Sequence, residues 1–213
     1  MKLSVICFLT VALAAVNAAT AIAGPYDDMT RAIATGEHAS VATLLHKGLD
    51  VNTANKDGET FLMMAAKEGN VNVVKALLAG KPKVAAQNAF GESALMLASI
   101  KGHIEVVRLL LAEGAQIDHS GWTPLMYAAS MNRLEVMKLL IVRGAKIEAA
   151  NAAGLTALML AAREGQTQAV LLLMEYGANV NQGASNGLTA LRAAKQRNQE
   201  EIVRLLTKAG ARD

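Results

Sequence analysis

The chain has 213 residues, of which 53% are hydrophobic and only 3% aromatic. So few aromatic residues beside abundant Ala, Leu, Val and Met indicate many thin cores rather than one thick core. Lys and Arg total 21 and Asp and Glu total 18, a formal net charge of +3. This excess is too small to indicate a nucleic-acid-binding protein, which carries a concentrated basic face.

The first 23 residues are predicted to form a cleavable secretory signal. Lys2 is their only charge, an apolar run from Leu3 to Val16 follows, and Ala21-Ile22-Ala23 provides the small residues that a signal peptidase reads. We expect cleavage before Gly24, with cleavage after Ala18 as the weaker option. An uncleaved anchor is the alternative, because the segment just reaches the roughly 20 residues that span a bilayer.

The consequence of cleavage is a chain without cysteine, because Cys7 is the only one. Such a chain can form no disulfide and has no thiolate for metal binding or catalysis. The short charged start and the Ala-x-Ala site are typical of bacterial signals. We therefore predict a periplasmic or secreted protein that has no membrane contact after cleavage.

Beyond residue 24 the sequence repeats itself about every 33 residues. The clearest marker is a Gly-x-Thr/Ser-x-Leu stretch whose glycines lie 33, 30, 33 and 33 residues apart, at Gly58, Gly91, Gly121, Gly154 and Gly187. About ten residues after each stretch comes a second apolar segment, such as Val73-Val74 with Leu77-Leu78. Each unit therefore predicts two short helices.

These motifs resemble the ankyrin repeat, whose pattern runs Gly-x-Thr-Pro-Leu-His-x-Ala-Ala, Gly-His, Ile-Val-x-x-Leu-Leu and Gly-Ala-x-Val-Asn. A divergent first repeat fits with Asp27 in the place of Thr, followed by Gly36 and Val51-Asn52. The resemblance implies an all-α solenoid of about six helix-turn-helix repeats with short β-hairpin fingers. The signal would be 1–23 and the ankyrin-repeat domain 24–213, with repeats at approximately 25–54, 55–87, 88–117, 118–150, 151–183 and 184–213.

Elementary physical chemistry accounts for the repeated residues. A hydroxyl before each first helix can cap its exposed N–H groups, at Thr60, Ser93, Thr123, Thr156 and Thr189. Left-handed turns are expected to end these helices at Gly69, Gly102 and Gly165, with Asn132 and Asn198 as substitutes. One repeat cannot bury its own apolar faces, so stability must come from its neighbours in the stack.

Two junctions depart from the pattern. Lys81 stands where the other repeats have glycine after the second helix, and a left-handed non-glycine residue costs about 1–2 kcal/mol. We expect that junction to be strained or rearranged. The hairpin at 117–121 is three residues short, so its finger is expected to be truncated and to dent the edge of the binding surface.

Few residues suggest catalysis or ligand binding. Met63, Met96, Met126 and Met159 recur where the family has His, and they are predicted to fill the core. Copper(I) or redox buffering is the alternative, since thioethers are soft ligands, and exposed methionines would favour it. Asp118-His119-Ser120 is the sole hint of a hydrolase, and it lacks a second acid or base. We predict no catalytic residue, metal site or cofactor.

Partners of ankyrin repeats are held by the fingers and by the concave face of the first helices. At these positions the middle repeats carry apolar residues, including the only tryptophan. Exposed apolar clusters with an aromatic residue are typical of interaction hot spots. The predicted partner-binding residues are Lys67, Phe90, Glu92, Ile100, Lys101, Trp122, Met131, Leu155 and Arg163. Alternatively, Trp122 and Phe90 fold back and fill the space beside the short hairpin.

The predicted function is non-enzymatic binding of another protein by a monomer outside the cytoplasm, with no nucleic acid partner. Exported bacterial ankyrin proteins, which this chain resembles, are sometimes tied to stress defence, so a stress-defence or envelope partner is one hypothesis. The basic last repeat, with Lys195, Arg197, Arg204, Lys208 and Arg212, is predicted to be a polar cap. Docking of an acidic partner or membrane surface there stays an alternative.

Overall fold

The computed structural model describes residues 24–212. Twelve α-helices follow one another in that part of the chain and pair into six hairpins. They are α1 (Pro25–Thr35), α2 (His38–His46), α3 (Phe61–Glu68), α4 (Val71–Ala79), α5 (Ala94–Lys101), α6 (Ile104–Ala112), α7 (Pro124–Ser130), α8 (Leu134–Val142), α9 (Ala157–Arg163), α10 (Thr167–Glu175), α11 (Ala190–Gln196) and α12 (Glu200–Lys208). The predicted all-α solenoid of about six repeats is confirmed.

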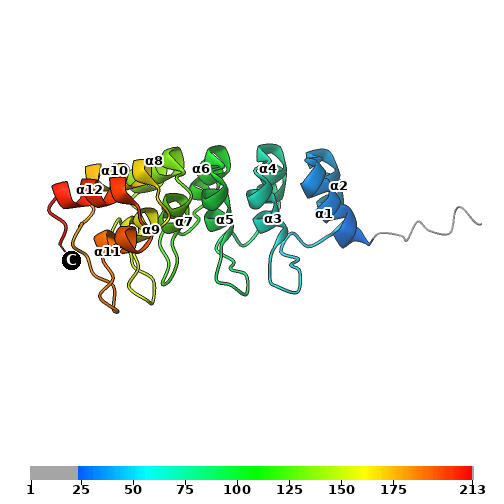
Figure 1. The fold of residues 1–213 in the computed structure, drawn as a ribbon. Coiled ribbons are helices and arrows are strands. Elements are labelled where there is room, and N and C mark those ends of the chain that lie inside the picture. Colours follow the sequence, from blue (N-terminus) through cyan, green and yellow to red (C-terminus); the bar gives the residue numbers. More distant parts are fainter. Residues whose placement is uncertain (1–23, 213) are drawn as a thin grey trace, which may run out of the picture.

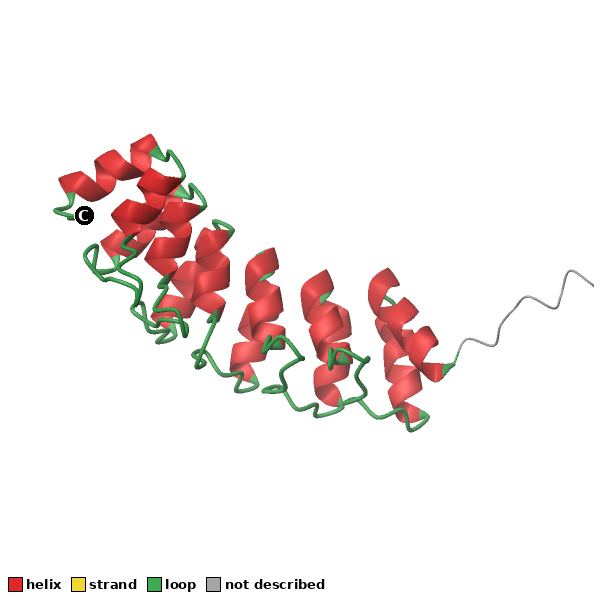
Figure 2. Ribbon diagram, turned by 60° about the horizontal axis from the view of Figure 1, so that its bottom comes forward, coloured by secondary structure: helices red, strands yellow, loops and turns green. Residues whose placement is uncertain are grey.

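The hairpins stack in chain order, with α1 and α2 at one end and α11 and α12 at the other (Figure 1). Each first helix packs on the first helices of the neighbouring repeats, from α1 on α3 to α9 on α11, and the second helices pack likewise, from α2 on α4 to α10 on α12. The long loops between repeats project from one side of the stack (Figures 1 and 2). None of the twelve helices within residues 24–212 has the length and hydropathy needed to span a membrane.

The helix starts follow the predicted capping chemistry in repeats two to six. In each, the Thr or Ser hydroxyl before the first helix accepts a hydrogen bond of 3.2–3.4 Å from the N–H of the third helical residue. The first repeat starts differently. There α1 begins earlier, at Pro25, with Gly24 as the N-cap, and Asp27 lies in the first turn, where its carboxylate accepts from the Gly24 N–H at 3.3 Å.

Left-handed residues end the helices as predicted. Gly69, Gly102 and Gly165 have φ of +80°, +85° and +74°, and Asn132 and Asn198 take the same conformation at +54°. Lys81 also adopts φ +54°, so its junction keeps the left-handed geometry at a cost of about 1–2 kcal/mol. The expected strain at Lys81 is present without a rearranged turn.

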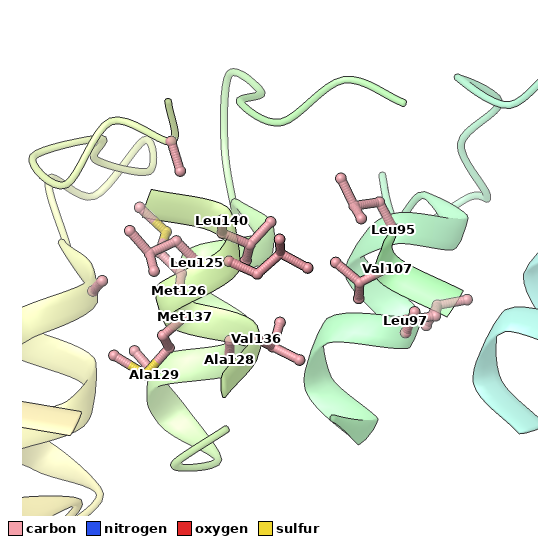
Figure 3. Close-up of a cluster of buried hydrophobic side chains, with 14 of the residues drawn as sticks. Leu95, Leu97, Val107, Leu125, Met126, Ala128, Ala129, Val136, Met137 and Leu140 are labelled. Carbon is pink, nitrogen blue, oxygen red and sulfur yellow. The ribbon is translucent and has the colours of Figure 1, made fainter. Parts of the chain in front are cut away.

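The core is thin and continuous from repeat to repeat. Figure 3 shows its central part, where Leu125, Met126 and Ala129 of α7 pack with Met137 and other side chains of α8. Alanines such as Ala129 are fully buried and allow the helices to approach closely. The predicted signal segment 1–23 and Cys7 lie outside the described residues.

Candidate binding surface

The long loops form fingers closed by a repeated pattern of hydrogen bonds. In four of them a backbone N–H donates to the carbonyl four residues later, as from Asn55 to Glu59 at 3.0 Å and from Asn88 to Glu92 at 3.0 Å. Two fingers also carry an isolated antiparallel bridge, between Ala54 and Thr60 and between Gln87 and Ser93. The predicted β-hairpins are thus reduced to single bridges in the described part of the chain.

Each finger is numbered by the repeat whose first helix follows it. The fourth finger, at 117–121 before α7, lacks this closure among the described residues. Side chains hold this finger instead. The Asp118 carboxylate accepts hydrogen bonds from the Lys146 N–H, at 3.3 Å to one oxygen and 3.4 Å to the other. The His119 Nδ1 lies 3.0 Å from the Gln87 Nε2, while the His119 Nε2 is buried and has no hydrogen-bond partner within residues 24–212. Asp118 and His119 therefore engage different neighbours, and no hydrogen bond within residues 24–212 joins them to Ser120 as a catalytic triad would.

Neighbouring fingers are bonded to one another at both ends of the row. The Ala89 N–H donates to the Asp57 carbonyl at 2.8 Å, and both the N–H and the hydroxyl of Ser185 donate to the Ala153 carbonyl, at 3.3 and 2.9 Å. The truncated fourth finger has no such bond within the described residues. Phe90, at the tip of the third finger, is 76% exposed, so it does not fold back to fill the space beside it.

In repeats two to six, the residues directly before the N-caps of the first helices form a row along the stack. It changes from acidic to apolar along the stack: Glu59, Glu92, Trp122, Leu155 and Leu188. All five are partly exposed. Trp122, Leu155 and Leu188 also pack in part against the core. A partner lying along the row would meet two carboxylates, an indole and two leucines in that order.

Trp122 sits in a polar-aromatic cluster with Glu92 and Tyr127. The rings of Trp122 and Tyr127 are 5.1 Å apart between centroids and tilted by 34°. The Tyr127 hydroxyl donates to Glu92 Oε1 at 3.0 Å. Burial, and after it the negative charge of Glu92, raises the pKa of Tyr127 to about 12. Trp122 is thus partly packed, as expected if it fills the space beside the short hairpin, and partly exposed, as expected of a binding residue.

The sequence reasoning missed Tyr127. Aligning the repeats would have found it, because it occupies the register of Met64, Leu97, Leu160 and Ala193 and is the only one of these with a hydroxyl. Three exposed apolar residues on the second-helix side were also missed, namely Val142, Leu171 and Tyr176.

The remaining predicted binding residues lie at the other end of the first helices. Lys67, Lys101 and Arg163 fall in the last turns of α3, α5 and α9, beside Ile100. Met131 follows α7 and is 46% exposed. The predicted set therefore forms two rows, one along the fingers and one along the helix ends. Phe90 and Met131 lie in different rows.

The methionine ladder is a structural feature of the core. The side chains are at most 1% exposed in Met63, Met96, Met126 and Met159. Copper(I) or redox buffering would be favoured by exposed methionines, so this burial argues against it. In two repeats the thioether also helps to cap its helix: Thr60 N–H donates to Met63 Sδ and Ser93 N–H to Met96 Sδ, both at 3.4 Å. No group of three or more His, Cys, Asp or Glu residues within 24–212 could hold a metal ion.

In three repeats the residue after the left-handed turn bonds to a carbonyl of the repeat before it. His103 Nε2 lies 3.0 Å from the Lys67 carbonyl, Arg133 Nε donates to the Ile100 carbonyl at 3.0 Å, and Gln166 Nε2 donates to the Ser130 carbonyl at 3.1 Å. His103 therefore has a structural role between the second and third repeats.

Comparison with known proteins agrees with this architecture. The family model for ankyrin repeats (3 copies) matches residues 29–119, 81–151 and 144–212. The chain is an ankyrin-repeat protein. Ankyrin repeats are an interaction scaffold rather than an enzymatic fold. A search of the curated proteins finds no significant match.

Among solved structures, this ankyrin-repeat protein is similar to a chain of the predatory endopeptidase Bd0816 from Bdellovibrio bacteriovorus in complex with the immunity protein Bd3460. The identity is 31% and the TM-score 0.75, and the match covers 85% of this chain and 97% of that chain.

Proposed function

We propose that this protein is an exported, non-enzymatic module that binds one other protein through its fingers and first-helix face. The observation that carries the proposal is the row of partly exposed residues before the helix caps, together with Phe90 at 76% exposure. Large apolar side chains at solvent-facing positions of a rigid scaffold are typical of a binding surface. The similar chain, from a complex of an immunity protein with an endopeptidase, supports a protein as the partner.

Export rests on the signal-like segment 1–23. We infer that the mature chain works in the periplasm and that its partner is also exported, with peptidases of the cell envelope as the first class to test. Fractionation of cells is the direct measurement. Recovery of a chain that begins at Gly24 from the periplasm supports export, whereas an unprocessed chain in the membrane fraction favours the anchored alternative.

Binding is tested by affinity capture from a periplasmic extract with the chain from Gly24 onward as bait. A second bait carries Phe90→Ser, Trp122→Ser and Met131→Ser, and its fold is checked by circular dichroism. A partner that is held by the wild type and lost by the variant supports the proposal. A partner held equally by both baits would move the site away from this surface, first to the basic last repeat.

A further inference from the structure

Two carboxylates occupy the same register in successive repeats. Glu59 and Glu92 each stand directly before the residue that caps a first helix, and each accepts a hydrogen bond from an asparagine of its own finger. These bonds run from Asn55 Nδ2 to Glu59 Oε2 at 3.3 Å and from Asn88 Nδ2 to Glu92 Oε2 at 2.9 Å. Because the two carboxylates have the same register and the same asparagine bond, their other contacts can be compared directly.

The difference is a missing cation. Glu59 pairs with Lys67 Nζ at 3.9 Å. One repeat later the position of Lys67 is taken by Ile100, and no Lys, Arg or His nitrogen within residues 24–212 forms an ion pair with Glu92 within 4.0 Å. Glu92 is partly buried. A cation beside a partly buried carboxylate would stabilise its charge, and no such cation is found among the described residues.

The free hydrogen-bonding sites of Glu92 suit one kind of cation. A carboxylate offers about four acceptor sites, two on each oxygen. Tyr127 takes one on Oε1 and Asn88 takes one on Oε2. One site is left on each oxygen, and the two parallel N–H groups of a guanidinium can donate to both oxygens of a carboxylate at once. A lysine ammonium would use such a pair of sites less well.

An aromatic wall flanks the same carboxylate. Tyr127, bonded to Glu92, packs its ring against Trp122, the next residue along the row of cap-preceding positions. Guanidinium groups stack on aromatic faces as well as pair with carboxylates. We propose that Glu92, Trp122 and Tyr127 form an arginine site, which receives an arginine side chain of the partner protein; this inference rests on the proposed function.

The first test uses Trp122 as its own probe, because it is the only tryptophan in the chain. The purified protein is titrated with acetyl-Ala-Arg-Ala-amide to about 20 mM while tryptophan fluorescence is recorded. The neutral isostere, with citrulline in place of arginine, is the matched ligand. The expected result is a saturable change with the arginine peptide alone. No saturable change, or an equal change with both peptides, overturns the arginine site.

Matched variants separate charge from structure. Glu92→Gln removes the charge, and Ile100→Lys supplies the internal cation that repeat two already has, while leaving Glu92 and its hydrogen bonds in place. Each substitution is expected to lower the affinity for the arginine peptide by about tenfold or more. Glu59→Gln is the control in the same register and is expected to change the affinity less than about twofold. Equal losses in Glu92→Gln and Glu59→Gln, or no loss in Ile100→Lys, would refute the site.

The same variants in the capture experiment distinguish the two proposals. A partner lost by both Glu92→Gln and Ile100→Lys supports the arginine site. If the partner stays bound to both variants but leaves the Phe90, Trp122 and Met131 variant, the arginine site is wrong while the proposed function stands. If no partner is captured by the wild type in any extract, the proposed function is wrong, whatever the peptide titration shows.

Discussion

The two ends of the finger row are built differently from its middle. At the ends, backbone groups join neighbouring fingers, through Ala89 and Asp57 on one side and Ser185 and Ala153 on the other. In the middle, the shortened fourth finger is tied by the side chains of Asp118 and His119. Backbone bonds form with almost any sequence, whereas side-chain ties need particular residues. The variable chemistry of the surface is therefore concentrated where the regular architecture is interrupted.

The middle is also where the charge pattern changes. Glu59 forms an ion pair with Lys67 of its own repeat at 3.9 Å, while Glu92 accepts hydrogen bonds from the neutral groups of Tyr127 and Asn88. The fold is the same in both repeats, so the difference reflects surface residues that packing leaves free. Such residues set the specificity of a scaffold without changing its stability much. The experiments below test whether the ends and the middle differ physically as well as chemically.

The largest effect is expected where a finger is packed against its neighbour. Gly154 has φ +79°, and a Cβ there would meet the backbone of Ala184 and Ser185 at 2.9 Å, whereas Gly91, at φ +75°, has open space around it. Gly154→Ala should cost about 3 kcal/mol of unfolding free energy, from left-handed strain plus displaced backbone. Gly91→Ala should cost only about 1 kcal/mol. Urea unfolding measures both, and equal losses would mean that the outer fingers are not packed as described.

A smaller contrast is expected in hydrogen exchange. The amides of Ala89 and Ser185 donate to a neighbouring finger, while the amides of residues 119–122 have no acceptor within the described residues. The two outer amides should exchange at least about tenfold more slowly than those of the fourth finger. Amide exchange followed by NMR gives the rates residue by residue. Protection of residues 119–122 equal to that of Ala89 would show that the short hairpin is closed after all.

The sequence predicts the fold well because each repeat carries its own signals. Thr60 and its counterparts mark helix starts and Gly69 and its counterparts mark helix ends, and five near-copies reinforce one another. The early start of α1 at Pro25, with Gly24 as its N-cap, could not be predicted from the repeat pattern, which places Asp27 in the register of Thr60.

The candidate surface could be predicted only as a set of positions. Which of them interact depends on side-chain contacts between repeats. The bond between Tyr127 and Glu92 spans 35 residues and joins an unusual residue of one repeat to a common residue of another. The missing cation at Glu92 likewise becomes visible only when Lys67 is seen to reach Glu59 across the length of a helix.

The smallest effect concerns the hydroxyl of Tyr127. Tyr127→Phe removes one partly exposed hydrogen bond to a carboxylate, so we expect a loss of about 1 kcal/mol. Tyr176→Phe is the control, because Tyr176 is exposed and its hydroxyl has no hydrogen-bond partner within the described residues. Chemical denaturation near neutral pH compares the two. A Tyr127→Phe protein as stable as Tyr176→Phe would show that this bond does not hold the third finger to the fourth repeat.

The pH dependence of the same variant gives an independent check. Burial and Glu92 raise the pKa of Tyr127 from 10.0 to about 12 in the folded state. Between these values the unfolded chain releases the phenolic proton while the folded protein keeps it, so stability must fall as pH rises through this range. Tyr127→Phe should make that fall shallower, while Lys titration cancels between wild type and variant. Unfolding curves at about pH 9 and about pH 11 measure the difference. An unchanged slope would mean that the Tyr127 hydroxyl faces water and that Glu92 keeps only the Asn88 side-chain amide as a donor.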